Sequence, residues 1–177
     1  MSIVKLPDPY ARFTPSELPQ KWDVRFMHLA ATHASWSKDP STKVGAIIAR
    51  GNRPISHGYN GFPARLSDKP EWLNDRNVKY PLTLHAEHNA VLSSREITIG
   101  ATCYVWPIPP CASCASILIQ EGVDIARVVS LLPTPEQRSR WGPQFELAFA
   151  VFDEAQVDLE LYPVDTFQNS EFWPKIV

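Results

Sequence analysis

Apolar residues recur along the chain with the spacing of helices in some segments and the alternation of strands in others. The stretch QKWDVRFMHLAATHASWS places its apolar residues on one stripe, which predicts a helix over residues 21–36. Two short apolar segments, VGAIIAR at 44–50 and PISHGYN at 54–60, flank the polar sequence GNR. This arrangement predicts a β-hairpin directly after the first helix.

Beyond the hairpin, residues 61–81 contain three prolines and mixed charges without a clear period, and we expect a long loop with one short helical piece. Helical and strand patterns then alternate. The predicted segments are helices at 85–96, 111–122 and 144–156 and strands at 101–106, 126–132 and 157–162. This order predicts an α/β fold, a three-layer α/β/α sandwich around a central mixed five-stranded sheet.

Length and composition narrow the class of protein. A chain of 177 residues with average apolar content suggests one domain, residues 1–177, with its core at about 20–162. The 17 basic and 19 acidic residues are scattered, and the net charge of −2 argues against a nucleic-acid polymer as partner. The N-terminus has no secretory apolar stretch and no segment is apolar enough to cross a membrane. We therefore expect a cytoplasmic protein that does not bind membranes.

The three cysteines indicate metal or redox chemistry and not a disulfide framework. Two of them, Cys111 and Cys114, lie in the sequence PCASC, a spacing that in a reducing compartment is typical of metal or redox sites. The third, Cys103, lies in the apolar run ATCYVW. We expect its thiol to be buried in the core.

A second motif, HAEHNA at residues 85–90, supplies a histidine and a glutamate at the start of a predicted helix. Zinc accepts imidazole and thiolate together, and a catalytic zinc takes three protein ligands and leaves one position for water. His85, Cys111 and Cys114 supply such a set. Both cysteines lie at a predicted helix start, where free N–H groups and the helix dipole favour the thiolate.

Glu87 is the candidate proton carrier of this site. Zinc lowers the pKa of a bound water to about 7, and a glutamate beside that water can pass its proton to a leaving nitrogen. An H-x-E motif followed by P-C-x-x-C is the signature of the zinc nucleobase deaminases. The alternatives are a redox C-x-x-C, a closed structural zinc site with His57 or His88 as fourth ligand, and chance. A regular helix would point His88 away from His85.

Four segments together resemble the deoxycytidylate (dCMP) deaminase family, within the cytidine deaminase superfamily: SKDPSTKVGAIIA, GYNGFP, HAEHNA and PCASCASILIQEGV. The resemblance implies a cytidine deaminase-like fold, one catalytic zinc per subunit, and hydrolysis of dCMP to dUMP and ammonia for thymidylate synthesis. It also implies a small-molecule nucleotide substrate, a homo-oligomer, and dCTP and dTTP as candidate effectors.

The resemblance also suggests roles for residues that contact the substrate. The backbone N–H of Ala86 would meet the pyrimidine carbonyl, and Asn60 would bind the sugar hydroxyl. Asn60 next to Gly61 is also typical of an ordinary turn. For the 5′-phosphate we favour Ser37 and Lys38 in the loop SKDPSTK. The alternative there is a turn with solvated lysines.

Further candidates for the phosphate are less favoured. They are Ser41, Thr42 and Lys43 in the same loop and Arg65, Arg76 and Lys79 in the long loop. Two other functions stay open. One is deamination of another small substrate, such as cytidine, a modified dCMP or a purine base. The other is a non-catalytic zinc-binding module, in which Glu87 would have no use.

Overall fold

A mixed sheet of five strands forms the centre of the computed structural model, which describes residues 10–120 and 122–174. The strands are β1 Gly45–Arg50, β2 Arg53–Tyr59, β3 Thr102–Trp106, β4 Arg127–Leu131 and β5 Asp158–Tyr162. Their order in the sheet is β2-β1-β3-β4-β5. β1 pairs antiparallel with β2 and β3, whereas β3, β4 and β5 are parallel. The predicted mixed five-stranded sheet is confirmed.

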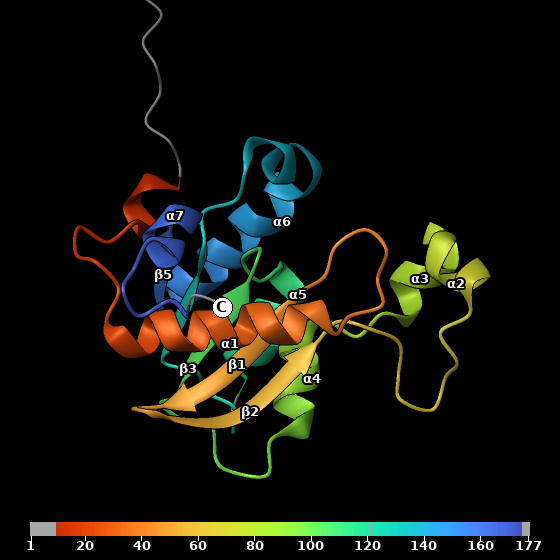
Figure 1. Ribbon diagram of the computed structural model, residues 1–177, viewed down its shortest axis with the longest axis horizontal. Coiled ribbons are helices and arrows are strands. Elements are labelled where there is room, and N and C mark those ends of the chain that lie inside the picture. Colours follow the sequence, from red (N-terminus) through yellow and green to blue (C-terminus); the bar gives the residue numbers. More distant parts are fainter. Residues whose placement is uncertain (1–9, 121, 175–177) are drawn as a thin grey trace, which may run out of the picture.

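Helices cover both faces of this sheet (Figure 1). The helices are α1 Lys21–Ser35, α2 Pro70–Asn74, α3 Arg76–Leu82, α4 Ala86–Ser93, α5 Ala112–Leu118, α6 Pro135–Glu154 and α7 Val164–Gln168, with a 3₁₀ turn at Ala11–Phe13. The apolar residues of α1 and α7 pack on one face, and those of α4, α5 and α6 pack on the other. The protein therefore has the predicted α/β/α layers.

Close packing of α4 against the sheet fixes the place where the HAEHNA motif begins. A Cβ atom on Gly58 of β2 would lie 2.3 Å from the carbonyl oxygen of Ala86 and 2.5 Å from the nitrogen of Ala90. Only glycine allows the backbone of α4 to approach the strand this closely. The start of α4 is thus held directly against the central sheet.

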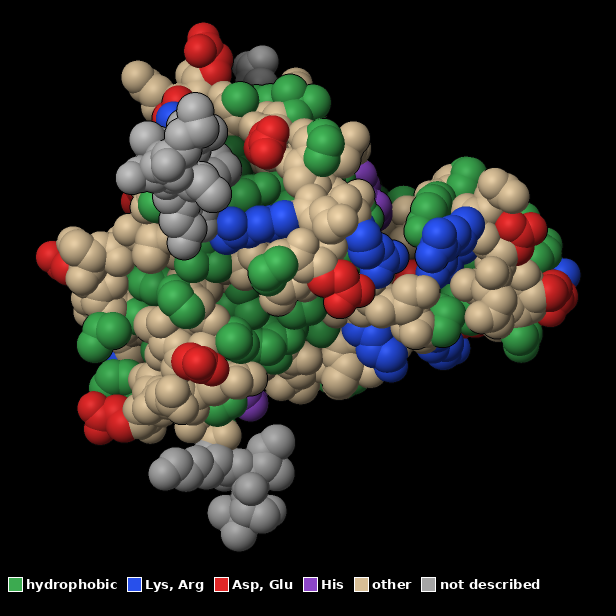
Figure 2. Space-filling model, turned by 90° about the horizontal axis from the view of Figure 1, so that it is seen from above, with side chains coloured by type: hydrophobic (Ala, Val, Ile, Leu, Met, Phe, Trp, Pro, Cys, Tyr) green, Lys and Arg blue, Asp and Glu red, His purple; other side chains and the backbone are tan. Residues whose placement is uncertain are grey.

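The long loop predicted after the hairpin contains two helices, α2 and α3, and not one short helical piece. Asp75 separates them, and its side chain accepts a hydrogen bond from the backbone N–H of Asn77 at 2.9 Å and so caps α3. The segment extends away from the main body (Figure 1). Figure 2 shows Lys and Arg side chains on both sides of the depression between the body and this segment.

Helix α6 begins at Pro135, so the predicted start at residue 144 was wrong. Thr134 and Gln137 form a capping box, and Pro135 occupies the first turn, where its missing N–H costs nothing. Pro143, which directly precedes the predicted start, lies inside the helix. The capping residues, and not the internal proline, mark where α6 begins.

None of the helices among residues 10–120 and 122–174 is long and apolar enough to span a membrane. The segment at 163–174, for which we made no prediction, adds α7, whose Phe167 is fully buried and packs with residues of α1. The predicted burial of Cys103 is confirmed, since its side chain is inaccessible in the core.

Candidate functional site

The N-termini of α4 and α5 bring the three predicted metal ligands together. His85 is the N-cap of α4, Cys111 is the N-cap of α5, and Cys114 lies in the first turn of α5. The His85 Nδ1 atom lies 3.2 Å from Cys114 Sγ and 3.4 Å from Cys111 Sγ, and the two sulfurs are 3.6 Å apart. These three residues form the metal-ligand cluster found among the described residues.

The spacing of these atoms fits a tetrahedral zinc. With Zn–S bonds of about 2.3 Å and Zn–N bonds of about 2.0 Å, two ligands of one zinc lie about 3.5–3.8 Å apart. The three observed separations are close to that range. One imidazole and two sulfurs are also a donor set that catalytic zinc sites use. The residues present therefore fit zinc.

The three ligands of the cluster differ in protonation, and one of them, Cys111, is already in its metal-binding form. A hydrogen bond from the Cys114 thiol, helped by His85, lowers the pKa of Cys111 to about 3. The same Cys111 sulfur raises the pKa of His85. Cys114 keeps its proton, because its hydrogen bond to Cys111 and its burial raise its pKa. Since zinc binds the deprotonated forms, its binding must release protons here.

Glu87 lies beside this cluster in the first turn of α4. Its side chain is 3% exposed, and burial raises its pKa above that of an ordinary glutamate. Ala86, the first residue of α4, is fully buried and lines the same pocket. As the backbone N–H of Ala86 lies in the first turn, it has no acceptor within the helix.

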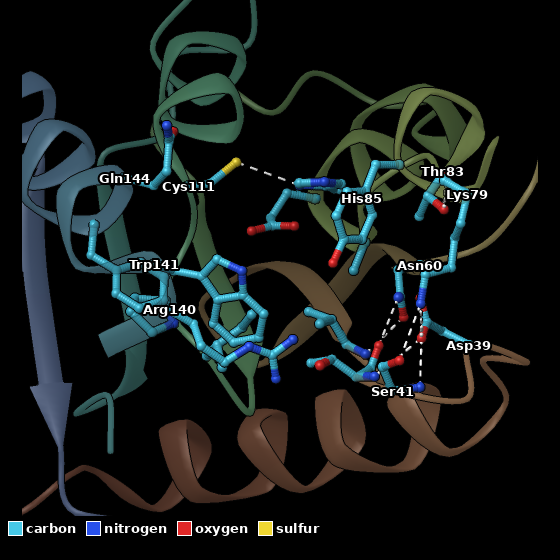
Figure 3. A pocket seen from close by; sticks show the side chains of 18 residues that line it. Asp39, Ser41, Asn60, Lys79, Thr83, His85, Cys111, Arg140, Trp141 and Gln144 are labelled. Carbon is cyan, nitrogen blue, oxygen red and sulfur yellow. Dashed lines mark hydrogen bonds and ion pairs between the residues drawn. The ribbon is translucent and has the colours of Figure 1, made fainter. Parts of the chain in front are cut away.

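A pocket of about 390 Å³ opens over the cluster. His85, Glu87 and Cys111 line one end of it. The rest of its wall comes from the loop before β1, the end of β2, α3, α6 and the segment between β3 and α5. Figure 3 shows Lys79 and Asp39 reaching it from one side and Arg140 and Trp141 from the other. A buried carboxyl, a metal cluster and a polar far wall thus share one cavity.

Asn60 lies at the end of β2, lines this pocket and is 6% exposed. Its Oδ1 accepts a hydrogen bond from the backbone N–H of Val44 at 2.8 Å, and its Nδ2 donates to the carbonyl of Thr42 at 2.9 Å. These bonds fix the orientation of the carboxamide. These two bonds leave the second N–H of Nδ2 unused.

Ser37 and Lys38, our preferred phosphate ligands, do not line the pocket. Ser37 is 1% exposed and donates its hydroxyl to the carbonyl of Asn60 at 2.8 Å. The side chain of Lys38 is 70% exposed and pairs with Asp68 at 2.7 Å. Their positions do not support a contact with a ligand in this pocket.

The turn after α1 explains why other residues of the loop face the pocket. Asp39 Oδ1 accepts the backbone N–H groups of Ser41 and Thr42, at 2.7 and 3.1 Å. This Asx-type turn directs Ser41 and Thr42 inward. Both were among the less favoured candidates.

Two lining cations come from outside that loop. Lys79 of α3, a less favoured candidate, is 4% exposed and lies 3.1 Å from Asp39 Oδ1. Arg140 of α6 was missed, because the predicted helix began after it. The sequence RSRW, a basic residue followed by tryptophan, was the signal available.

His88 and His57, the alternative fourth ligands, lie in different surroundings. The expectation that His88 points away from His85 was wrong: the two rings lie nearly parallel, with centroids 5.5 Å apart. Residues three apart share a helix face, which places His88 beside the N-cap. His57 contacts the His33 ring instead, at 4.5 Å. Neither His57 nor His88 belongs to the metal cluster.

Comparison with known proteins places residues 20–132 in a described family. They match the model of the cytidine and deoxycytidylate deaminase zinc-binding region. A protein of Aliivibrio fischeri called an uncharacterized deaminase in the luxG 3′ region is 40% identical over 146 residues, which cover 82% of this chain and 96% of that protein.

Human deoxycytidylate deaminase is 37% identical over 110 residues, 58% of this chain and 61% of the human protein. This chain thus matches less than two thirds of the human enzyme. The crystal structure of dCMP deaminase from the cyanophage S-TIM5, with dCMP and dUMP, covers 82% of this chain and 99% of its own, with a TM-score of 0.63. At 21% identity, this likeness shows the shared fold.

Proposed function

Since the chain belongs to the cytidine and deoxycytidylate deaminase family, we propose that it hydrolyses dCMP to dUMP and ammonia. The single observation that carries this proposal is the buried carboxyl of Glu87 beside the His85, Cys111 and Cys114 cluster in one pocket. The names of the human relative and of the cyanophage structure support dCMP as the substrate.

His85, Cys111 and Cys114 would hold the zinc of the family through Nδ1 and two sulfurs. When bound, zinc lowers the pKa of a water to about 7 and so supplies a nucleophile at neutral pH. Two thiolates offset the double positive charge of the ion. The site then needs a proton acceptor, which is the role we assign to Glu87.

Glu87 would take a proton from the attacking water and deliver it to the ring nitrogen. It would then take a second proton, from the hydroxyl newly added to ring carbon four, and deliver it to the departing amino group as the carbonyl forms. Burial raises the pKa of Glu87, so its carboxylate is a stronger base than an exposed glutamate and its protonated form is more accessible. One carboxyl can therefore serve as base and then as acid. Ammonia leaves with the second proton that Glu87 carried.

Ala86 and Asn60 would orient the nucleotide. The free backbone N–H of Ala86 would donate to the pyrimidine carbonyl, which holds the ring next to Glu87. The Asn60 carboxamide, fixed by Val44 and Thr42, would offer its remaining N–H to the sugar hydroxyl. Because both groups are held by backbone bonds, they are preorganised before the substrate arrives.

The setting of the enzyme follows from the family resemblance. We propose that residues 1–177 act as one domain in the cytoplasm, that the enzyme supplies thymidylate synthesis, and that it works as a homo-oligomer. dCTP and dTTP are the candidate effectors. Size measurement in solution, with and without each nucleotide, would test the last two points together.

Incubation of the zinc-loaded protein with dCMP tests the reaction. We expect ammonia and dUMP to appear in equal amounts, and a chelator to stop both. Glu87→Gln should lower turnover by about a hundredfold to ten-thousandfold, the usual contribution of general acid–base catalysis. Zinc content should stay at the wild-type level. Full activity in the variant would overturn the role of Glu87, and no product from the wild type would overturn the proposed reaction.

A further inference from the structure

The charges around the pocket raise the question of which group receives the phosphate of the proposed substrate. A phosphate monoester carries about −1.5 to −2 charges at neutral pH. Besides His85 in the metal cluster, two cationic residues line the pocket within the described part of the chain: Lys79 and Arg140. They differ in how far their charge is already balanced.

Lys79 is already committed to other partners. Its Nζ lies 3.1 Å from Asp39 Oδ1 and 3.2 Å from Ser41 Oγ, and its side chain is nearly inaccessible. The pair with Asp39 leaves this side of the pocket close to neutral. Without Lys79, the Asp39 carboxylate would repel an incoming phosphate. Lys79 therefore prepares the wall but brings no excess positive charge.

Arg140 has its charge available. Within residues 10–120 and 122–174 it makes no ion pair, and its guanidinium lies over the Trp141 ring, 4.4 Å from the centroid. Such stacking restricts the side chain without neutralising it. In Figure 3 Arg140 points into the pocket from α6, on the wall that faces Ser41 and Asp39. A guanidinium also matches phosphate oxygens with two parallel donors.

We propose that Arg140 is the residue that binds the 5′-phosphate, with the Ser41 and Thr42 hydroxyls on the facing wall, and that it sets the preference for nucleotide over nucleoside. The proposal rests on the proposed function and deepens it. Arg140 lies in α6, outside the matched zinc-binding region at 20–132. Chemistry and phosphate selectivity thus come from different parts of the chain.

Kinetics of Arg140→Gln on two substrates test this assignment. We expect the ratio of kcat/KM for dCMP to kcat/KM for deoxycytidine to fall about 10- to 100-fold, as for loss of a charge-assisted hydrogen bond. The fall should lie mainly in KM for dCMP. Lys38→Ala is the matched control, because Lys38 is a cation outside the pocket. It should leave the ratio at the wild-type value.

Binding of the product to the zinc-loaded protein provides a readout that does not depend on turnover. Titration calorimetry with dUMP and deoxyuridine should show that Arg140→Gln weakens dUMP about 10- to 100-fold and deoxyuridine much less. Equal loss for both ligands, or unchanged dUMP binding, would overturn the role of Arg140. If the wild type deaminates nothing but binds dUMP through Arg140, the proposed reaction fails while this assignment stands.

Discussion

Two of the partly buried charge clusters among the described residues differ in how completely their atoms are paired. In one, Arg127 lies between Asp23 and Glu160 and donates to both oxygens of each carboxylate, at 2.6–3.1 Å. The hydroxyls of Tyr104 and Tyr162 add a bond of 2.8 Å to each acid. This network also borders a hollow of about 290 Å³.

The other group consists of His85, Glu87, Cys111 and Cys114. Its charges are not paired in this complete way. Burial raises the pKa of Glu87, whereas the pKa of Cys111 is lowered to about 3. Protonation states that disagree within one small cluster are typical of functional sites. A hollow is present in both places, so concavity does not distinguish them. What distinguishes them is the pairing of their atoms: the Arg127 network is complete within the protein, whereas the residues of the second group fit a metal and a substrate.

The largest effect on zinc content and turnover should follow from removal of a metal ligand. Cys114→Ser should lose zinc and lower turnover by at least about a thousandfold, since a metal nucleophile is worth several kcal/mol. Zinc content and turnover are the measurements. Cys103→Ala is the matched control, because Cys103 is equally buried but lies in the core. Retention of zinc and activity by Cys114→Ser would contradict the assigned ligand set.

Removal of Arg127 should instead affect stability. Arg127→Met leaves the buried carboxylate of Asp23 and the partly buried carboxylate of Glu160 without their shared cation, which should cost up to about 3–5 kcal/mol of unfolding free energy. Urea denaturation measures this loss. Turnover per folded molecule and zinc content should hardly change, because Arg127 lines the other hollow. A variant with wild-type stability and reduced turnover would reverse our reading of the two groups.

Lowering the pH should have a smaller effect on the free energy of unfolding. Burial opposes the ionisation of Asp23, but Arg127 and Tyr104 outweigh it, and the pKa of Asp23 falls below its ordinary value of 3.8. The stabilisation of the fold by the ionised Asp23 carboxylate is present above the unfolded-state pKa. It is lost as pH falls through the lower folded-state pKa. Asp23→Asn should cost about 1–3 kcal/mol at neutral pH.

Acid titration of the two proteins, followed by circular dichroism, measures that effect. The stability difference between wild type and Asp23→Asn should shrink as pH falls below about 4, where the Asp23 carboxylate of the unfolded wild-type chain begins to be protonated. A difference that stays constant down to pH 2 would show that the ionised carboxylate does not stabilise the fold.

The parts of the protein that local sequence determines were predicted well. The sheet followed from short apolar runs, and the metal cluster followed from motifs whose residues lie at two helix starts, where caps are set by a few neighbouring residues. His88 shows a limit even there. We predicted that it points away from His85, although a spacing of three residues brings it beside that ring.

The wall of the pocket opposite the metal ligands could not be predicted from local sequence. Lys79 and Asp39 are separated by the hairpin and α2, so only the folded chain shows their ion pair. Arg140 reaches the pocket because α6 begins at Pro135 and packs beside α5. Pairing of this kind depends on tertiary packing and leaves no local pattern.

The most direct test of the account compares ammonia release from dCMP, CMP, deoxycytidine, cytidine and dCTP by the zinc-loaded wild-type protein. We predict that dCMP has the highest kcat/KM, since the metal cluster and Glu87 act at one end of the pocket and Arg140 receives one phosphate at the other. Faster turnover of the unphosphorylated nucleosides would contradict the phosphate assignment. Failure to release ammonia from any of the five would contradict the proposed reaction itself.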